Sequence, residues 1–198
     1  TAALAGAWRS GLGSIPWAIA LQQYNLLDSH DTERIRSMVG GNDALHRLAV
    51  AAQLTFPGIP GLYYGDEIGM MDAPGLGSRG CMIWDEHQWN HSLATFYRRL
   101  ISLRRNSPAL QQGGFQVLAV EPDAFAYQRE HPAGRILVIG QRSATPRPAG
   151  PLPVAHGGIA DGTRFVDFVT GRDSVVTDGA LPLDEVSQGV VLWLEVEP

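Results

Sequence analysis

The sequence has a single cysteine, no lysine and no long hydrophobic run. One cysteine, Cys81, excludes an internal disulfide framework and a cysteine-rich zinc site. No apolar stretch approaches the roughly 18 residues that a membrane helix needs, so a membrane span is not expected. The 15 basic residues are all arginine and are outnumbered by 20 acidic ones, and the net charge of −5 argues against a broad nucleic-acid-binding surface. We interpret the missing lysine as a compositional bias of the gene.

What is present suits a folded, loop-rich protein. The 198 residues give room for one ordinary domain or two small ones, and 44% of them are hydrophobic. Glycine and proline, with 23 and 13 residues, stay below the disordered range. The segment Thr1–Gly6 carries no initiator methionine, basic segment or cleavage pattern, so it does not resemble a signal peptide. We expect the chain to begin inside a longer protein.

Helices alternate with short strands up to about residue 112. Apolar residues at three- and four-residue spacing predict one helix over residues 44–56, which Pro57 ends, and another over residues 93–105. Short apolar strands are predicted over residues 24–27 and 61–64. This order of helix, strand, helix, strand and helix is typical of βα units with a parallel sheet.

Four arginines lie near the C-terminal end of the second predicted helix, where cations interact favourably with the negative end of the helix dipole. We interpret them as a solvated helix face rather than a binding stripe. They are Arg98, Arg99, Arg104 and Arg105.

A period of two replaces the helical spacing after residue 112. The strands expected from it are Gln116–Val120, Ala124–Arg129, Ile136–Gly140, Arg164–Val169, Ser174–Thr177 and Val190–Val196. The stretch Ala144–Gly158 has four prolines and three glycines and is predicted to be a long surface loop. Such strands suggest an antiparallel β-sandwich. We therefore divide the chain into an α/β domain, residues 1–112, and an all-β domain, residues 113–198.

Functional groups in parallel α/β proteins gather where strands end and loops begin. The first predicted strand ends in a segment that contains adjacent His30 and Asp31, a donor–acceptor pair that can hold a polyhydroxylated ligand. A carboxylate there can also stabilise a developing positive charge. The structural alternative is that Asp31 caps the next segment and His30 satisfies a buried carbonyl group. Spacing alone leaves both interpretations open.

The second predicted strand runs into two tyrosines, Tyr63 and Tyr64, and two acids, Asp66 and Glu67. Tandem tyrosine rings and hydroxyls suit the face of a sugar. The alternative is that the rings pack in the core and the carboxylates bond to local backbone. A glycine-rich excursion, Met71–Gly80, follows this segment.

Four segments resemble the α-amylase superfamily of glycoside hydrolases in order and spacing. Residues 25–34, NLLDSHDTER, resemble the family's fourth signature region, and residues 56–70, FPGIPGLYYGDEIGM, resemble the segment around its eighth barrel strand. Residues 78–85, SRGCMIWD, and 96–104, FYRRLISLR, continue the likeness. The likeness is strongest to the neopullulanase, cyclomaltodextrinase and maltogenic amylase branch. The tail, including residues 161–171, DGTRFVDFVTG, is similar to the family's C-terminal sandwich.

The resemblance implies a fold in two parts. The last part of a (β/α)8 barrel, with its strands seven and eight, is followed by an antiparallel β-sandwich. A whole barrel takes about 250 residues, so residues 1–112 are too few to close one. The family carries its nucleophilic aspartate after strand four and its acid/base glutamate after strand five, and this chain has neither region. Because a retaining glycosidase needs both carboxyls, the isolated chain is expected to be inactive.

The resemblance also gives roles to four residues of this chain. Asp31 matches the family's third catalytic acid, which grips sugar hydroxyls at the cleavage position and stabilises the transition state. His30 matches its companion in binding the same sugar. Arg34 is expected to orient carboxylates or sugar hydroxyls, and Arg79 to contact sugar further along the cleft.

One position departs from the pattern of this branch. The branch usually has an acid four residues before the loop arginine, where this chain has Gly75. Asp72 is the candidate to replace that acid, so the geometry of the neighbouring sugar subsite is expected to differ.

We therefore expect part of a retaining enzyme that hydrolyses α-1,4, and also α-1,6, glucosidic bonds in α-glucans or maltooligosaccharides. One alternative is a non-catalytic fragment that serves as a carbohydrate-binding or oligomerisation module. Its candidate sugar-stacking aromatics on the sandwich are Phe165, Phe168 and Trp193, for which core packing is the structural alternative. Another alternative is a transglycosylase of the same superfamily.

No cofactor or metal is indicated by these residues, and calcium is left open only for the longer protein. The expected partners besides the glucan are the remainder of the barrel or a second copy of the chain, either of which would cover apolar strand surface around Leu26, Leu27, Leu62 and Tyr63. Neither nucleic acid nor membrane is an expected partner. A cytoplasmic location is expected from the single cysteine and from the resemblance.

Overall fold

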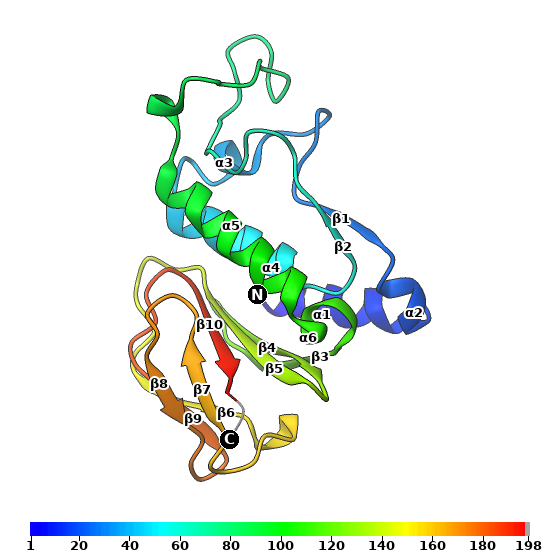
Figure 1. Cartoon of the computed structure of the whole chain (residues 1–198), viewed down its shortest axis with the longest axis vertical. Coiled ribbons are helices and arrows are strands. Elements are labelled where there is room, and N and C mark those ends of the chain that lie inside the picture. Colours follow the sequence, from blue (N-terminus) through cyan, green and yellow to red (C-terminus); the bar gives the residue numbers. More distant parts are fainter. Residues whose placement is uncertain (197–198) are drawn as a thin grey trace.

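The structure, a computed structural model, describes residues 1–196. In its N-terminal part, helices alternate with two short strands, β1 (Tyr24–Leu26) and β2 (Ile59–Gly61), which pair in parallel. The helices are α1 (Ala2–Gly13), α2 (Trp17–Ala20), α3 (Ile35–Met38), α4 (Asp43–Thr55), α5 (His91–Asn106) and α6 (Pro108–Gln112), with a 3-10 turn, η1 (Glu86–Gln88). The predicted α/β order with a parallel sheet is confirmed (Figure 1).

The second strand ends at Gly61, where the predicted strand begins. A side chain at Gly61 would place its Cβ 2.3 Å from the Tyr24 ring, so glycine permits the close pairing of the two strands. Beyond Gly61 the chain leaves the ladder, because the Tyr64 carbonyl accepts a hydrogen bond from Arg34 instead. Leu62 is consequently 39% exposed, and the prediction of a buried strand over this stretch is wrong.

Helices α4 and α5 form the frame of this half. The Asn42 side chain caps α4 by accepting the Leu45 N–H at 3.0 Å, and Asn90 caps α5 in the same way through Leu93. Pro108 ends α5 and occupies the first turn of α6, where its missing N–H costs nothing. Both long helices were expected from the apolar spacing, and both are confirmed.

The C-terminal part is built on one antiparallel sheet with the order β3-β4-β5-β10-β7-β8. Its strands are β3 (Gly114–Val120), β4 (Ala124–His131), β5 (Gly134–Gln141), β7 (Arg164–Asp167), β8 (Asp173–Val175) and β10 (Gly189–Glu195). These correspond to the six predicted strands, which are confirmed. Consecutive strands form hairpins in β3-β4-β5, and β10 returns to pair with both β5 and β7.

A second, two-stranded sheet covers one face of the first and corrects one prediction. Its strands β6 (Gly150–Pro153) and β9 (Ala180–Leu183) pair antiparallel, and a 3-10 turn, η2 (Ala155–Gly157), follows β6. Strand β6 lies inside the stretch predicted to be a surface loop, yet Leu152 is only 3% exposed. The prediction failed because prolines flank Leu152 on both sides and proline is typical of loops. Proline is nevertheless tolerated in an edge strand.

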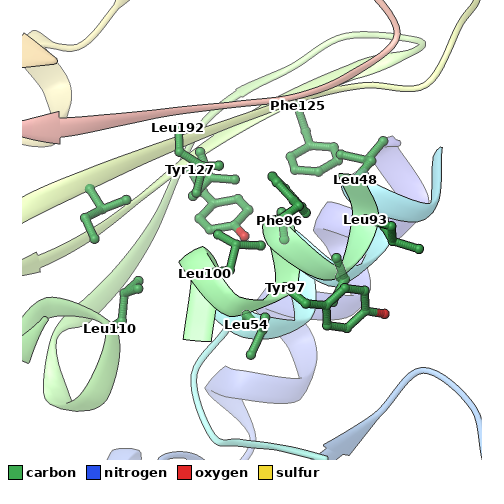
Figure 2. Close-up of a cluster of buried hydrophobic side chains, with 14 residues drawn as sticks. Leu48, Leu54, Leu93, Phe96, Tyr97, Leu100, Leu110, Phe125, Tyr127 and Leu192 are labelled. Atoms are coloured by element: carbon green, nitrogen blue, oxygen red, sulfur yellow. The ribbon is translucent and has the colours of Figure 1, made fainter. Parts of the chain in front are cut away.

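The large sheet has a hydrophobic core on each face, as the period of two requires. Phe125 and Tyr127 point to the face covered by α4, α5 and α6, and Figure 2 shows them together with Leu48 and Leu100. Ala126, between them in the sequence, joins the opposite core, which packs against β6 and β9. The C-terminal part is therefore a β-sandwich whose outer face carries the helices (Figure 1).

The helix-side core is shared by both halves of the chain. It includes Leu48 of α4 and Leu100 of α5 together with Tyr127 and Leu192 of the sheet. The helices approach so closely that a Cβ at Gly140 would lie 2.7 Å from Leu48 and closer still to the Phe125 ring. The division into domains at residue 112 stays a prediction, and the two proposed parts bury their apolar surfaces against each other.

Two arginines, Arg104 partly buried and Arg129 completely buried, bind the carbonyl groups at the end of α4, where a helix has no further partners of its own. Arg104 of α5 donates to Leu54 at 2.7 Å and to Phe56 at 3.2 Å. Arg129 of β4, which is completely buried, donates to Thr55 at 2.6 Å and to the two glycines before and at the start of β3. The expectation of a solvated helix face is therefore wrong for Arg104.

No helix within residues 1–196 combines the length and apolarity that a bilayer crossing requires.

The two-stranded parallel sheet presents apolar side chains to solvent. Tyr24 is 65% exposed, and Leu26 and Ile59 are each 50% exposed. Within residues 1–196, β1 and β2 pair only with each other, so the outer edge of each strand is open. The expected exposure is confirmed for Leu26 and Leu62, whereas Leu27 and Tyr63 are partly buried and Leu27 packs against the helix-side core. Such a surface favours association.

Arg129→Met is expected to lower the free energy of unfolding by about 3 kcal/mol, because three buried carbonyl groups lose a charged donor. Urea unfolding followed by circular dichroism measures this change. The matched control is Arg142→Met, since Arg142 is exposed and pairs only at the surface. Equal effects of the two substitutions would contradict the role assigned to Arg129.

The double substitution Leu26→Ser and Ile59→Ser is expected to reduce self-association of the chain several-fold, because it makes the exposed strand face polar. Light scattering coupled to size-exclusion chromatography at two protein concentrations measures this. The control is Val169→Ser, which changes an equally exposed apolar residue on the sandwich. A wild-type chain that stays monomeric at both concentrations would contradict the expectation.

Candidate active site

The loops that follow β1 and β2 meet at the end of the molecule opposite the sandwich (Figure 1). The loop after β1 leaves the sheet at Asp28 and returns to α3 at Ile35. It is closed at its base because the Asp28 carboxylate accepts the Ile35 N–H at 2.6 Å. Asp28, rather than Asp31, therefore satisfies the first turn of α3. Residues 29–33 project from this base into solvent.

His30, Asp31 and Arg79 come together at the surface. The Asp31 carboxylate accepts a hydrogen bond from the Arg79 guanidinium at 2.9 Å, and its other oxygen lies 3.2 Å from His30 Nε2. About two thirds of each of these three side chains is exposed, with 64% for His30 and 67% for Asp31. The two loops, 48 residues apart at these positions, thus place a carboxylate between two groups that donate hydrogen bonds.

These side chains line a shallow hollow of about 370 Å³. The floor and rim come from both loops, and the residues involved are His30, Asp31, Thr32, Glu33, Asp72, Leu76, Gly77, Ser78 and Arg79. Three acids, an imidazole and a guanidinium around one open depression suit a ligand rich in hydroxyl groups, which can donate to the carboxylates and accept from the cation.

Arg34 lies beneath the hollow rather than in it, with no exposed surface. Its guanidinium donates to the carbonyls of Tyr64 and Ser78, at 2.6 and 3.0 Å, and to the Asp66 carboxylate at 3.1 Å. It therefore has no atom with which to bind substrate directly in this arrangement. The other expected role, orienting a carboxylate, agrees with the contact to Asp66.

The tandem tyrosines also serve the fold. The Arg34 guanidinium lies 4.7 Å from the centres of both the Tyr63 and Tyr64 rings. The Tyr64 hydroxyl donates to the Gly80 carbonyl at 2.6 Å. Stacking and hydrogen bonding thus attach Arg34 to the loop that carries Arg79. The rings hold the two loops together at a partly exposed position, since Tyr64 is 39% exposed, so the alternative that they pack in the core is wrong for Tyr64.

Asp72, the candidate to replace the missing acid at Gly75, is engaged in hydrogen bonds within the protein. Its carboxylate accepts the Arg34 N–H at 3.2 Å, and its own N–H donates to the Ser37 hydroxyl at 2.8 Å. Asp72 therefore ties the glycine-rich loop to the start of α3. It still lines the hollow beside Arg79.

Two acids beneath the hollow went unassigned in the analysis of the sequence. Asp28 and Asp66 are 4% and 3% exposed, and their carboxyl groups lie within hydrogen-bonding reach of each other. Burial, together with the neighbouring Asp28, raises the pKa of Asp66 to about 8, although Arg34 acts in the opposite direction. The signal that could have found them is their position, since Asp28 directly follows the predicted strand 24–27 and Asp66 stands two residues after the predicted strand 61–64.

The described part of the chain, residues 1–196, brings together no group of three or more side chains suited to a metal ion. The hollow itself offers carboxylates, an imidazole and a guanidinium. A carboxylate that a guanidinium holds in place can offer a preorganised negative charge to a bound group that develops positive charge.

Residues 7–92 match the family model described as "Alpha amylase, catalytic domain". The neopullulanase 2 of Thermoactinomyces vulgaris is 37% identical over 177 residues, which is 86% of this chain and 29% of that protein. The cyclomaltodextrinase of Thermoanaerobacter pseudethanolicus is 42% identical over 121 residues, 61% of this chain and 21% of that protein. This chain thus spans less than a third of the length of these relatives.

A solved structure of a cyclomaltodextrinase superposes with a TM-score of 0.82 at 30% sequence identity. The superposition covers 94% of this chain and 32% of that one, so it includes both the helical half and the sandwich. The arrangement of the two halves is therefore the same in both proteins.

Arg34→Met and Arg79→Met are expected to differ sharply in their effect on stability. The first leaves a buried carboxylate and two buried carbonyls without their donor and is expected to cost on the order of 3 kcal/mol. The second breaks an exposed ion pair and is expected to cost less than about 1 kcal/mol. Urea unfolding of both variants measures this, and equal losses would contradict the division between a buried frame and an exposed site.

Proposed function

Because the chain belongs to the α-amylase family, we propose that it contributes part of the active site of a retaining glycoside hydrolase that acts on α-glucans. Asp31 is the proposed catalytic residue, and His30 and Arg79 are the proposed substrate-binding residues. Arg34 is proposed as a positioning residue, because its buried guanidinium orients Asp66 and joins the two loops.

One observation carries this proposal. The loop after β1 and the loop after β2 place His30, Asp31 and Arg79 within hydrogen-bonding distance around one exposed hollow. A purely structural role for Asp31 would leave its carboxylate buried or bonded to backbone, whereas it is 67% exposed and meets only side chains that can donate. The geometry therefore suits recognition of a hydroxyl-rich ligand.

In the proposed reaction, Asp31 acts on the sugar at the cleavage position without forming a bond to it. Its carboxylate accepts hydrogen bonds from two ring hydroxyls and favours a distorted ring with developing positive charge. The nucleophile and the acid/base group would be two further carboxyls about 5–5.5 Å apart, as retention requires. We propose that residues outside this chain supply them, and that the chain alone does not cleave glucans.

The remaining expectations belong to the same proposal. Residues 1–112 would be the last part of the barrel, and residues 113–198 the sandwich domain. The rest of the barrel is the proposed partner for the exposed face of β1 and β2. The related proteins named cyclomaltodextrinase and neopullulanase favour maltodextrins as the substrate class. A cytoplasmic location stays a prediction.

The three aromatic residues that suggested a sugar-binding sandwich are not available to stack on a sugar. Phe165 is completely buried and Trp193 is 6% exposed, so both belong to the core between the sheets. Phe168 is partly buried beneath the Arg99 guanidinium, which lies 4.6 Å from its ring centre. The interpretation of these aromatics as core residues is confirmed, and they offer no sugar-stacking surface.

Asp31→Asn is expected to lower kcat by about 100-fold or more, because an amide cannot supply the negative charge that the transition state needs. The test uses a chimera in which this chain replaces the matching segment of the Thermoanaerobacter cyclomaltodextrinase. Hydrolysis of maltooligosaccharides is measured by product chromatography, which also separates hydrolysis from transfer to a second sugar.

Glu86→Gln is the matched control, since Glu86 is an exposed acid outside the hollow. It is expected to change kcat by less than about threefold. A chimera that retains full activity with Asp31→Asn would overturn the catalytic role. Glucan cleavage by the purified 198-residue chain alone would overturn the proposal that the nucleophile lies outside it.

A further inference from the structure

Beneath the proposed site, two carboxyl groups share one cation in a buried position. Asp28 and Asp66 are 4% and 3% exposed, and the Arg34 side chain between the two loops is completely buried. Arg34 reaches Asp66 at 3.1 Å, and Asp28 lies within hydrogen-bonding reach of Asp66. Two buried carboxylates beside one guanidinium leave an unbalanced negative charge, which is costly in a low dielectric.

We propose that Asp28 and Asp66 share one proton in the folded chain and that this proton holds the loop bearing His30 and Asp31 in position. Asp66 donates the proton to Asp28. Asp28 accepts hydrogen bonds from Asp66 and from the Ile35 N–H, and the second of these closes the loop at its base. Both acids are positioning residues. The functional half of this inference rests on the proposed function, because the position of Asp31 matters for catalysis only if Asp31 grips the sugar.

The groups around the pair do not remove the charge imbalance. They come from the two loops and from α4 and α5, and they are Arg34, His46, Tyr63, Tyr64, Glu67, Asp72 and Tyr97. Burial lowers the pKa of His46 to about 4, so this side chain is neutral near pH 7. Burial and the nearby carboxyls raise the pKa of Tyr97, which therefore stays protonated and shares a hydrogen bond with His46 at 3.0 Å. Of the groups that act on the pKa of Asp66, Arg34 is the cation, whereas Arg36 and Arg47 act on His46 and Arg79 acts on Tyr63.

The consequence for stability has a definite sign. Burial and Asp28 raise the pKa of Asp66 to about 8 in the folded chain, above about 3.9 in the unfolded chain. The protonated acid is favoured by folding, so its contribution is fully present below about pH 4 and is lost as the pH rises towards 8. Above that pH, repulsion between two buried carboxylates acts on the base of the loop that carries Asp31.

The test is a carboxyl titration by ¹³C NMR of the 198-residue chain labelled at aspartate, without any sugar. One aspartate signal is expected to titrate near pH 8, and the amide signals of His30 and Asp31 are expected to shift with the same midpoint. Asp66→Asn, which keeps a donor for Asp28, and Asp28→Asn, which leaves Asp66 alone with Arg34, are each expected to abolish this titration. Glu67→Gln, which changes the neighbouring acid, is expected to leave it intact.

Thermal unfolding between pH 5 and pH 9 gives a second readout. The melting temperature of Asp66→Asn is expected to rise relative to that of the wild type as the pH increases from 5 to 9. Titration of every aspartate below about pH 5 would overturn proton sharing. A high-pH titration without movement of the His30 and Asp31 signals would overturn the positioning role. Neither result depends on the activity of Asp31, which the chimera tests separately.

Discussion

The carbonyl groups at the C-terminal end of α4 are the point on which the rest of the structure depends. A helix end leaves such groups without partners, and here two guanidiniums from different halves of the chain bind them. Arg104 of α5 takes Leu54 and Phe56, and Arg129 of β4 takes Thr55. The residues that follow lead directly into β2. The position of β2, and of the loop behind it, is therefore set by contacts that begin in the sandwich.

The shared core has the same effect on a larger scale. One face of the large sheet is covered by α4, α5 and α6, and the other by β6 and β9. The helices lie against the sheet without an intervening layer, since Gly140 leaves room for Leu48. The hollow with His30, Asp31 and Arg79 stands at the far end of this assembly, on loops that are tied together by polar contacts rather than by an apolar core.

Much of the fold could be predicted because the local pattern and the final environment agree. The apolar spacing of α4 and α5 and the period of two in β3, β4 and β5 follow from one-sided burial. Prediction failed where a local signal pointed elsewhere. Prolines beside Leu152 marked a loop, although the leucine fills the core between the sheets. The apolar run after Gly61 indicated a buried strand, but the carbonyl of Tyr64 is taken by Arg34.

The part of the site that consists of sequence neighbours could be predicted. His30 and Asp31 stand side by side in the sequence, and the resemblance added Arg79. The burial of Arg34 and the proximity of Asp28 to Asp66 arise from the meeting of two loops about forty residues apart, and no local pattern encodes it. The charge and size of an acidic residue do not indicate whether its side chain will be exposed.

Three arginines, two of them completely buried, give a structural consequence to the absence of lysine. Arg34, Arg104 and Arg129 each serve three acceptors at once, which the planar guanidinium allows and a single ammonium group would satisfy less rigidly. Burial lowers the pKa of Arg129 to about 10. A lysine starts from a lower pKa, so the same burial would bring its pKa closer to neutral pH and leave part of its population uncharged. The junction between the two halves thus keeps a fixed charge over the pH range in which Asp28 and Asp66 are proposed to titrate. A change of pH can therefore alter the loops around the hollow while the charges at the junction between the two halves stay the same.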